Sequence, residues 1–411
     1  MTDTAYKEAL ALLSCSGQQH LLRFYEELTD TEKENLLTQI RETDFSYLAR
    51  FPEKDRPLSR GRITPLAAME LSEIRKHAGT YSEKGLDALR DGRVAAVLLA
   101  GGMGTRLGTN GPKGCFDIGI TKPVYIFQRL VENLLLRVRE CGRQIHLFVM
   151  TSDVNDEATR LFFREHDNFG YDENYLHFFR QEMAPAVDNH GHVLLDRKDA
   201  LAASPNGNGG WFRSLDRAGY TELLTREGIG YLNVFAVDNV LQNICDPVFI
   251  GAVIENGCVS GSKVVRKSSA EEKVGVMCLE DGRPSVIEYY EMTDEMLHAE
   301  DDRGERLYNF GVILNYLFRV PDLIRVMDAD LPVHFANKKI PYIAEDGSRI
   351  LPDEPNGWKF EYFIFDILKE LGSCLPFEVE RNREFAPVKN AKGADSVETA
   401  RALCLENGID L

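Results

Sequence analysis

The chain has 411 residues, which is enough for one large α/β domain with appendages or for two to three average domains, and 44% of them are apolar. Its formal net charge of −17 argues against nucleic acid and anionic membranes as partners, because proteins that bind them concentrate basic residues. Eight scattered cysteines without a Cys-x-x-Cys pair, no apparent signal peptide and no run of membrane-spanning length together predict a cytoplasmic protein with free thiols.

The first 90 residues form a predicted N-terminal helical region. Apolar residues recur at helical spacing over residues 21–28, and Thr31 with Glu34 could form a capping box at the start of the next helix. A further helix is expected over residues 66–77. No chemistry is evident in this region, so we expect a helical layer packed beside the main domain.

Short apolar runs then alternate with helical segments through a predicted catalytic domain at residues 91–391. This alternation predicts a doubly wound α/β fold with a mixed, mainly parallel sheet, whose ligands bind outside the carboxyl ends of the strands. After residue 250 the pattern changes to hairpins, which we expect to form an antiparallel insertion covering a ligand. Strands are expected at 94–100, 145–150, 176–179 and 231–237, helices near 123–139, 156–166 and 215–227, and a hairpin at 274–279 and 285–290.

A glycine-rich loop directly after the first of these strands is suited to a polyphosphate. Gly101, Gly102 and Gly104 carry no Cβ, so successive N–H groups can turn toward an anion, while Arg106 and Lys113 add positive charge. The chain has no Gly-Lys dipeptide, which excludes a P-loop, and the glycine spacing is one residue too long for a dinucleotide fingerprint. The alternative is a glycine turn that binds no ligand.

Two further segments could serve the same ligand. Asn206–Gly210 precedes a helical stretch, so it could present helix N-terminal N–H groups to the ligand or be only a flexible loop with a helix cap. Asp238 ends a buried strand and could hold Mg²⁺ together with substrate phosphates, or it could cap the following turn. His190 and His192 could also ligate a metal, but Gly191 between them favours a turn.

These segments resemble the nucleotide-sugar pyrophosphorylases of the UDP-N-acetylhexosamine type. The signature of that family, Gly-Gly-x-Gly-Thr-Arg-Leu-Gly followed by Pro-Lys-Gly, stands at residues 101–108 and 112–114, and the resemblance extends over residues 86–391. It implies a nucleotide-diphospho-sugar transferase fold, which is GT-A-like, and a UTP-dependent sugar-1-phosphate uridylyltransferase.

The resemblance also implies a role for each matching residue. The family's triphosphate loop, uracil-contacting glutamine, second glycine loop and Val-Asp-Asn segment make the expected nucleotide contacts Gly101, Gly102, Gly104, Thr105, Gln181, Gly207, Asn208, Gly209 and Asp238. Segments that line the family's sugar pocket make the expected sugar contacts Asn208, Gly275, Glu288, Asn309, Phe363 and Phe365. The expected catalytic residues are Arg106, Lys113 and Lys389, and Asp238 is the expected ligand of Mg²⁺.

The implied reaction joins UTP and N-acetylglucosamine 1-phosphate to give UDP-N-acetylglucosamine and pyrophosphate. The sugar phosphate attacks the α-phosphorus in line, and no covalent enzyme nucleophile is needed because this phosphate is already ionised. Phe310 and Val312 depart from the family pattern beside Asn309, so glucose 1-phosphate and galactose 1-phosphate remain alternatives. A non-catalytic nucleotide-sugar sensor is a further alternative, against which the presence of both Lys113 and Asp238 argues.

Residues 392–411 are expected to form a short tail in place of the family's C-terminal domain. The oligomeric state therefore stays open, a monomer included.

Overall fold

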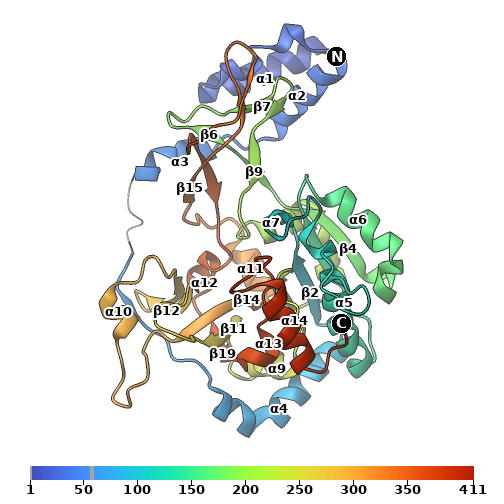
Figure 1. Ribbon diagram of the computed structural model, residues 1–411, viewed down its shortest axis with the longest axis vertical. Coiled ribbons are helices and arrows are strands. Elements are labelled where there is room, and N and C mark those ends of the chain that lie inside the picture. Colours follow the sequence, from blue (N-terminus) through green and yellow to red (C-terminus); the bar gives the residue numbers. More distant parts are fainter. Residues whose placement is uncertain (1, 56–59) are drawn as a thin grey trace. The chain divides into compact units, whose positions relative to one another are not determined.

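The computed structural model describes residues 2–55 and 60–411, which group into two compact units (Figure 1). Unit 1 comprises Met1–Ser59, Glu182–Gly210 and Leu331–Ile364, and unit 2 comprises Arg60–Gln181, Trp211–Asp330 and Phe365–Leu411. Each unit is assembled from segments that are distant in the sequence. The units therefore do not follow the consecutive boundaries expected at residues 90 and 391.

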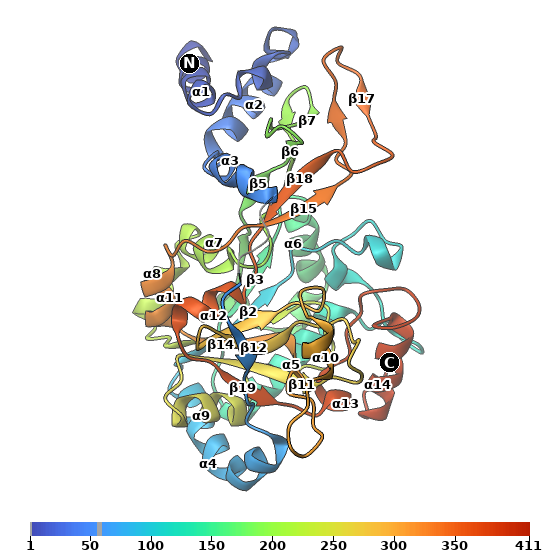
Figure 2. The same ribbon diagram turned by 90° about the vertical axis from the view of Figure 1, so that its left-hand side faces the viewer.

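Unit 2 is built on a ten-stranded mixed sheet, which confirms the predicted α/β class. Its main order is β1-β12-β14-β10-β2-β3-β4, with β13 beside β12 and β11 between β14 and β19. Figure 2 shows β2, β3, β11, β12, β14 and β19 of this sheet. Strands β10, β2, β3 and β4 are parallel, while β14 is antiparallel to β10, β11 and β12. The strands are β1 Ile63–Pro65, β2 Val94–Leu99, β3 Leu147–Thr151, β4 Leu176–Arg180, β10 Tyr231–Ala236, β11 Ser260–Arg266, β12 Val276–Glu280, β13 Arg283–Ile287, β14 Phe310–Arg319 and β19 Leu375–Glu378.

The parallel strands all end at one edge of the sheet. Every residue of β2 is buried, as expected for a strand covered on both faces. Leu99 lies opposite Ala236 of β10 and Met150 of β3, and Met150 in turn lies opposite Phe179 of β4. The segments that follow β2, β3, β4 and β10 are therefore neighbours.

The hairpin expected after residue 250 is present as β12 and β13 and is continuous with the central sheet through β14. Strand β1, which the sequence did not predict, pairs with β12. The helix expected at residues 66–77 corresponds to α4, which begins five residues later and is longer than expected. The helices of unit 2 are α4 Leu71–Arg90, α5 Ile126–Cys141, α6 Asp156–Glu165, α7 Trp211–Arg217, α8 Tyr220–Arg226, α9 Pro247–Glu255, α10 Asp294–His298, α11 Val320–Val326, α12 Asp366–Leu371, α13 Arg381–Glu384 and α14 Val397–Glu406.

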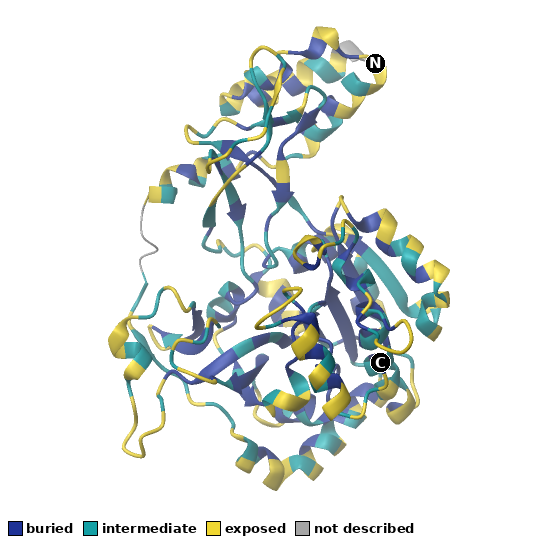
Figure 3. Cartoon of the chain, in the orientation of Figure 1, coloured by how far each residue is buried: buried dark blue, intermediate teal, exposed yellow. Residues whose placement is uncertain are grey.

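One hydrophobic core joins the sheet of unit 2 to its helices (Figure 3). Helix α4 packs against α9 and α5, and the core buries Phe127, Phe163 and Phe249 completely or nearly so. The C-terminal residues belong to this core as well, because α14 buries Ala400 and Cys404 in it. The segment that the sequence suggested as a tail is therefore an integral part of unit 2.

Unit 1 combines the N-terminal helices with short strands from the other two segments. Its core includes Leu13, Leu36, Val187 and Phe360, so these helices share a core with strands of the same unit, rather than forming a layer on the main sheet. Sheets pair β18 with both β15 and β6, β5 with β9, β7 with β8, and β16 with β17. The elements are α1 Thr2–Ser16, α2 Asp30–Glu42, α3 Tyr47–Arg50, β5 Met183–Pro185, β6 Val187–Asp188, β7 Leu195–Arg197, β8 Ala200–Leu201, β9 Ala203–Pro205, β15 His334–Lys338, β16 Tyr342–Ile343, β17 Arg349–Ile350 and β18 Gly357–Glu361.

The predicted capping box was wrong by two residues. Thr29 is the N-cap of α2, and its backbone N–H donates a hydrogen bond to the Glu32 carboxylate at 2.8 Å. Both Thr29 and Thr31 have a glutamate three residues later, so spacing could not distinguish them.

Among the described residues, no helix is both long enough and apolar enough to cross a bilayer.

Candidate active site

The glycine-rich loop after β2 has its carbonyl groups fixed by two polar side chains from the end of β3. The buried Asn155 donates to the carbonyls of Ala100 at 2.9 Å and Gly102 at 3.3 Å, and Ser152 donates to that of Gly101 at 2.9 Å. Among the hydrogen bonds of the described residues, none is donated by the N–H groups of Gly101 and Gly102. This arrangement leaves the N–H groups available to an anion, as the sequence suggested.

Sequence reasoning missed Ser152 and Asn155. The available signal was their position, because polar residues directly after a buried parallel strand fall at the ligand-binding edge of the sheet. They bond to a loop about fifty residues earlier in the chain, and this pairing depends on the parallel register of β2 and β3.

Gln181 lies directly against the loop. A Cβ atom at Gly101 would be 2.2 Å from Nε2 of Gln181, so a larger residue there would displace the end of the Gln181 side chain. The backbone N–H of Gln181 donates to the carbonyl of Thr151 at 2.8 Å, which extends the pairing of β4 with β3. The absence of a side chain at Gly101 thus leaves Gln181 in place, and the expected uracil contact adjoins the expected phosphate contact.

The rest of the loop folds back on itself. Thr105–Leu107 and Lys113–Cys115 are short 3-10 helices, so Thr105 and Arg106 lie on the first of them. Gly104 donates to the carbonyl of Gly111 at 2.9 Å, and Lys113 donates its backbone N–H to that of Gly102 at 3.1 Å. These bonds bring Lys113 beside the glycines that precede it by about ten residues.

Lys113 lies close to the expected metal ligand and to the other two expected catalytic cations. The Lys113 Nζ lies 3.7 Å from Oδ2 of Asp238, and both side chains are largely buried. Burial lowers the pKa of Lys113; the Asp238 carboxylate opposes this effect, and the nearby charges of Lys389 and Arg106 lower it further. The structure thus brings together four residues from three separate segments of unit 2.

Lys389 reaches this cluster because its segment pairs with the residues after β10. The N–H of Val388 donates to the carbonyl of Asp238 at 2.8 Å. The Lys389 ammonium donates to Asp395 at 3.0 Å, and both of these side chains are about 40% exposed. Such an exposed ion pair contributes little to stability, so a phosphate can compete for Lys389.

Two of the expected sugar contacts lie together in unit 2. A Cβ atom at Gly275 would be 3.4 Å from Oε1 of Glu288. Burial raises the pKa of Tyr316, and Cys374, Glu288 and Asp366 raise it further. Sequence reasoning did not single out Tyr316, because within an apolar strand it has no distinguishing pattern.

Asn309 and Phe365 are also buried in unit 2. The Asn309 side chain accepts from Arg306 at 3.4 Å, and its carbonyl accepts from Lys267 at 2.9 Å. The neighbouring Phe310, which departs from the family pattern, stacks its ring under the Arg266 guanidinium, 5.2 Å from the ring centre.

The second glycine loop, Asn206–Gly210, belongs to unit 1 and is tightly bonded. Asn206 is buried and donates to the hydroxyl of Tyr47 at 3.0 Å and to Glu182 at 3.2 Å. Gly207 has φ +83, and a Cβ there would be 2.3 Å from the carbonyl oxygen of Tyr362. These contacts do not fit the flexible loop that was considered as an alternative.

Hydrogen bonds to the segment after β18 hold Asn208 and Gly209, two of the residues of this loop that are expected to contact the ligand. Gly209 donates to the carbonyl of Tyr362 at 2.8 Å, and Asn208 Oδ1 accepts from the N–H of Ile364 at 2.9 Å. Phe363 packs on the ring of His334, with 4.4 Å between centroids. The Asn208 side chain therefore keeps its amide NH₂ and the second lone pair of its oxygen for a ligand.

His190 and His192 form a turn, as their sequence favoured. The Asp188 carboxylate accepts the N–H groups of both residues at 2.8 and 2.9 Å, and Gly191 has φ +88. Among the residues that the structure describes, no group of three or more histidine, cysteine or acidic side chains is arranged to hold a metal ion.

Comparisons with known proteins identify the family. The family model described as UTP–glucose-1-phosphate uridylyltransferase matches residues 45–403. The chain belongs to this family. The uridylyltransferase is 36% identical to the UDP-N-acetylglucosamine pyrophosphorylase of Saccharomyces cerevisiae, over 99% of this chain and 90% of the yeast protein. It is also 36% identical to UDP-N-acetylhexosamine pyrophosphorylase-like protein 1 of Homo sapiens, over 97% and 84%.

Solved structures confirm the fold of the uridylyltransferase. It is similar to the uridine diphosphate N-acetylglucosamine pyrophosphorylase of Trypanosoma brucei, whose structure was determined with an inhibitor, with a TM-score of 0.85 and 29% identity over 98% of this chain and 84% of the other. A putative UDP-N-acetylglucosamine pyrophosphorylase of Entamoeba histolytica gives a TM-score of 0.76 with 34% identity over 82% and 86%. The enzyme is therefore a nucleotidyltransferase of the nucleotide-diphospho-sugar transferase fold.

Proposed function

We propose that this uridylyltransferase joins UTP and N-acetylglucosamine 1-phosphate to form UDP-N-acetylglucosamine and pyrophosphate. The relatives named for this sugar nucleotide support the choice of substrate. The observation that carries the chemistry is the convergence of Arg106, Lys113, Lys389 and Asp238 next to a loop with available N–H groups. Such a site suits two polyanionic substrates that must meet.

Catalysis in this proposal consists of positioning and of charge screening. An oxygen of the sugar phosphate attacks the α-phosphorus of UTP in line, and pyrophosphate leaves. Gly101 and Gly102 bind phosphate oxygens through their N–H groups. Gly104 and Thr105 are the other proposed nucleotide contacts of this loop, and the N–H of Gly104 is already bonded to Gly111. Arg106, Lys113 and Lys389 screen the repulsion between the two anions and stabilise the charge that develops on the leaving group.

Asp238 is the proposed protein ligand of Mg²⁺. A single carboxylate is sufficient for this ion, because Mg²⁺ is usually held by one or two carboxylates together with substrate phosphates and water. The site fits this mode, since Asp238 adjoins the phosphate loop and no larger cluster of ligands occurs among the described residues. When bound, the ion would screen the triphosphate charge.

The remaining contacts are proposed for the base and the sugar. Gln181 presents both a donor and an acceptor to the uracil edge, and the second glycine loop contacts the nucleotide. Glu288 and Asn309 bind sugar hydroxyl groups, beside a backbone kept open at Gly275. Among the proposed contacts, Gly207, Asn208, Gly209 and Phe363 belong to unit 1, and Phe365 belongs to unit 2.

Pyrophosphate release tests this function. The protein is mixed with UTP, Mg²⁺ and one sugar 1-phosphate at a time, and kcat/KM is compared for N-acetylglucosamine, glucose and galactose 1-phosphates. The highest value is expected for N-acetylglucosamine 1-phosphate. A higher value for either other sugar would replace the substrate, and no release with any sugar would support a nucleotide-sugar sensor.

We also propose that the protein works in the reducing cytosol, as its eight unpaired cysteines suit that compartment.

A further inference from the structure

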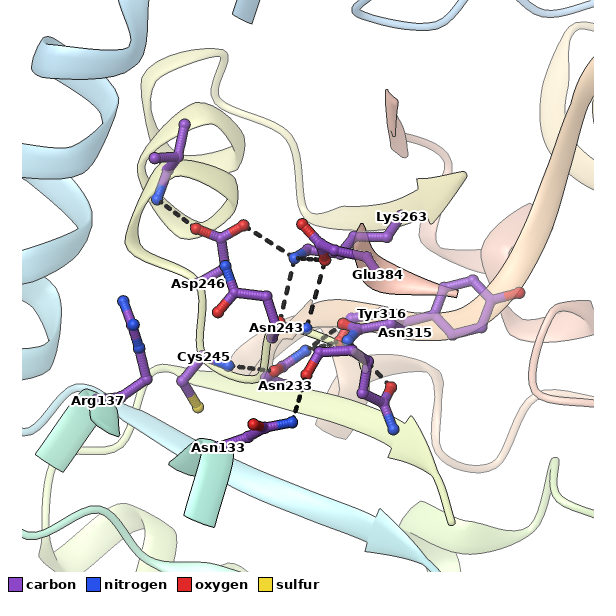
Figure 4. A network of polar contacts seen from close by, with 12 residues as sticks. Asn133, Arg137, Asn233, Asn243, Cys245, Asp246, Lys263, Asn315, Tyr316 and Glu384 are labelled. Carbon is purple, nitrogen blue, oxygen red and sulfur yellow. Dashed lines mark hydrogen bonds and ion pairs between the residues drawn. The ribbon is translucent and has the colours of Figure 1, made fainter. Parts of the chain in front are cut away.

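A completely buried lysine in unit 2 holds three acceptors from two different segments (Figure 4). Lys263 of β11 is 0% exposed. Its ammonium donates to Asp246 Oδ2 at 2.8 Å, to Glu384 Oε2 at 2.6 Å and to the carbonyl of Asn243 at 3.1 Å. An ammonium has three N–H donors, so this residue is fully satisfied and has no donor left for a substrate.

The first segment held by Lys263 is the loop between β10 and α9, which begins with Asp238. Asp246 ends this loop as the N-cap of α9, and its other carboxylate oxygen accepts from Val248 at 3.0 Å. The adjacent Cys245 donates its N–H to the Asn233 side chain of β10 at 2.7 Å. The loop that contains Asp238 is therefore fixed at its C-terminal end, where Asp246 accepts a hydrogen bond from Lys263.

The second segment is Glu384–Lys389, which follows α13. Glu384 accepts through its backbone carbonyl from the Asn239 side chain at 2.7 Å, and Asn239 accepts in turn from the N–H of Ala386 at 2.9 Å. Two residues further on, the N–H of Val388 bonds to the carbonyl of Asp238. Glu384 is thus the first residue of the segment that runs beside Asp238 and Asn239 and contains Lys389.

The two acidic partners of Lys263 favour its charged form despite its burial. Burial alone would lower the pKa of Lys263, but Asp246 and Glu384 outweigh it and raise the pKa above its usual value. Burial raises the pKa of Glu384, which Lys263 partly opposes. A buried ion pair often stabilises a protein no better than apolar side chains of the same volume, so its clearest use is to fix one arrangement.

We propose that Lys263 is a positioning residue for uridylyl transfer. By holding Asp246, Asn243 and Glu384 at one point, it sets the position of Asp238 relative to Lys389. The inference rests on the proposed roles of Asp238 and Lys389, and it assigns no contact between Lys263 and the substrate.

Steady-state kinetics of three variants test the proposal. Lys263→Met removes the link to both segments, and Glu384→Leu removes only the link to the Lys389 segment while Lys263 keeps Asp246. Since a displacement of about 1 Å can cost about 100-fold, we expect kcat to fall about 100-fold in Lys263→Met and about 10-fold in Glu384→Leu. The KM for UTP should change by less than about 3-fold, because the loss falls on the transition state. Glu384→Gln keeps an oxygen acceptor for Lys263 and should retain kcat within about 3-fold.

A matched control separates positioning from stability. Asp322→Asn weakens the ion pairs of another largely buried carboxylate of unit 2 with the exposed Arg319 and Arg325, and should lower the melting temperature without lowering kcat. If Lys263→Met fails to fold, Glu384→Leu decides the question. The proposal is overturned if the folded variants keep wild-type kcat, if Glu384→Gln loses as much as Glu384→Leu, or if Asp322→Asn loses kcat equally. A wild-type protein that releases no pyrophosphate would instead defeat the proposed function.

Discussion

The two glycine loops of this enzyme have similar composition but are fixed by different means. The loop of unit 2 follows β2 directly, and its carbonyls bond to side chains at the end of the adjacent strand β3. The loop Asn206–Gly210 of unit 1 is fixed by Tyr362 and by Ile364, which is 156 residues away from Asn208. The first loop takes its shape from the sheet it follows, whereas the second depends on contacts with remote segments.

The largest effect should come from the cation in the first loop. Lys113→Ala is expected to lower kcat by about 1000-fold, since it removes a preorganised charge beside the reacting phosphates. The melting temperature should hardly change, because Lys113 approaches Asp238 only at 3.7 Å. Pyrophosphate release and thermal unfolding measure the two quantities.

Lys122→Ala is the matched control for Lys113→Ala. Lys122 is an exposed lysine that pairs with Asp410, so its loss should leave turnover unchanged. If Lys113→Ala keeps near-wild-type turnover, the proposed catalytic role of Lys113 in the first loop is wrong.

Two alanine substitutions separate packing from binding within the first loop. A Cβ at Gly101 would strike Gln181, so Gly101→Ala should lower the free energy of unfolding by about 1–3 kcal/mol and kcat/KM for UTP by about 100-fold. A Cβ at Gly102 meets no protein atom within 4 Å, so Gly102→Ala should keep stability within about 0.5 kcal/mol while raising the KM for UTP. Urea unfolding and initial rates measure both. Equal stability of the two variants would contradict the packing role of Gly101.

The second loop should respond to a substitution through unit 1. Gly207→Ala places a Cβ against Tyr362 at a positive φ, and we expect it to lower the free energy of unfolding by about 2 kcal/mol. Gly17→Ala is the control, because Gly17 has φ +70 with nothing within 4 Å of its Cβ and thus reports the backbone effect alone. If the two variants lose the same stability, the close approach of Tyr362 does not hold the loop.

The smallest expected effect is a pH dependence of stability caused by His177, which lies in neither glycine loop. Burial, and to a lesser degree His146, lowers the pKa of His177 to about 4. The unfolded chain therefore binds a proton at higher pH than the folded one, so stability should fall as pH drops from about 6.5 toward 4 and level off below that. In urea unfolding between pH 7 and 4.5, His177→Gln should lose about 1–2 kcal/mol less than the wild type. An equal loss in both would show that other groups cause the decline.

The sequence was most informative where neighbouring residues decide the structure. The unbroken apolar run of β2 indicated a strand buried on both faces, and the glycines after it indicated where an anion could bind. Spacing failed where two patterns fit equally, as with Thr29 and Thr31 at the start of α2. The brief strand β1 has too few residues to show any periodicity, so it was missed.

The site was predictable in its residues, but not in the contacts that hold them. Asp238 and Lys389 could be named from their motifs, whereas Lys263, Ser152 and Asn155 lie in segments without a distinguishing pattern. Their importance arises only from hydrogen bonds to residues far away in the chain, such as the bond from Lys263 to Glu384.

The sequence by itself determined the α/β class and the family, and it predicted a phosphate loop, because burial patterns, glycine spacing and charge act over short stretches of chain. Tertiary structure decided the assembly of unit 1 from three segments, the inclusion of α14 in the core of unit 2, and the network around Lys263. Those features depend on which distant residues the packed core brings within hydrogen-bonding distance, and that proximity follows from the complete fold rather than from any local pattern.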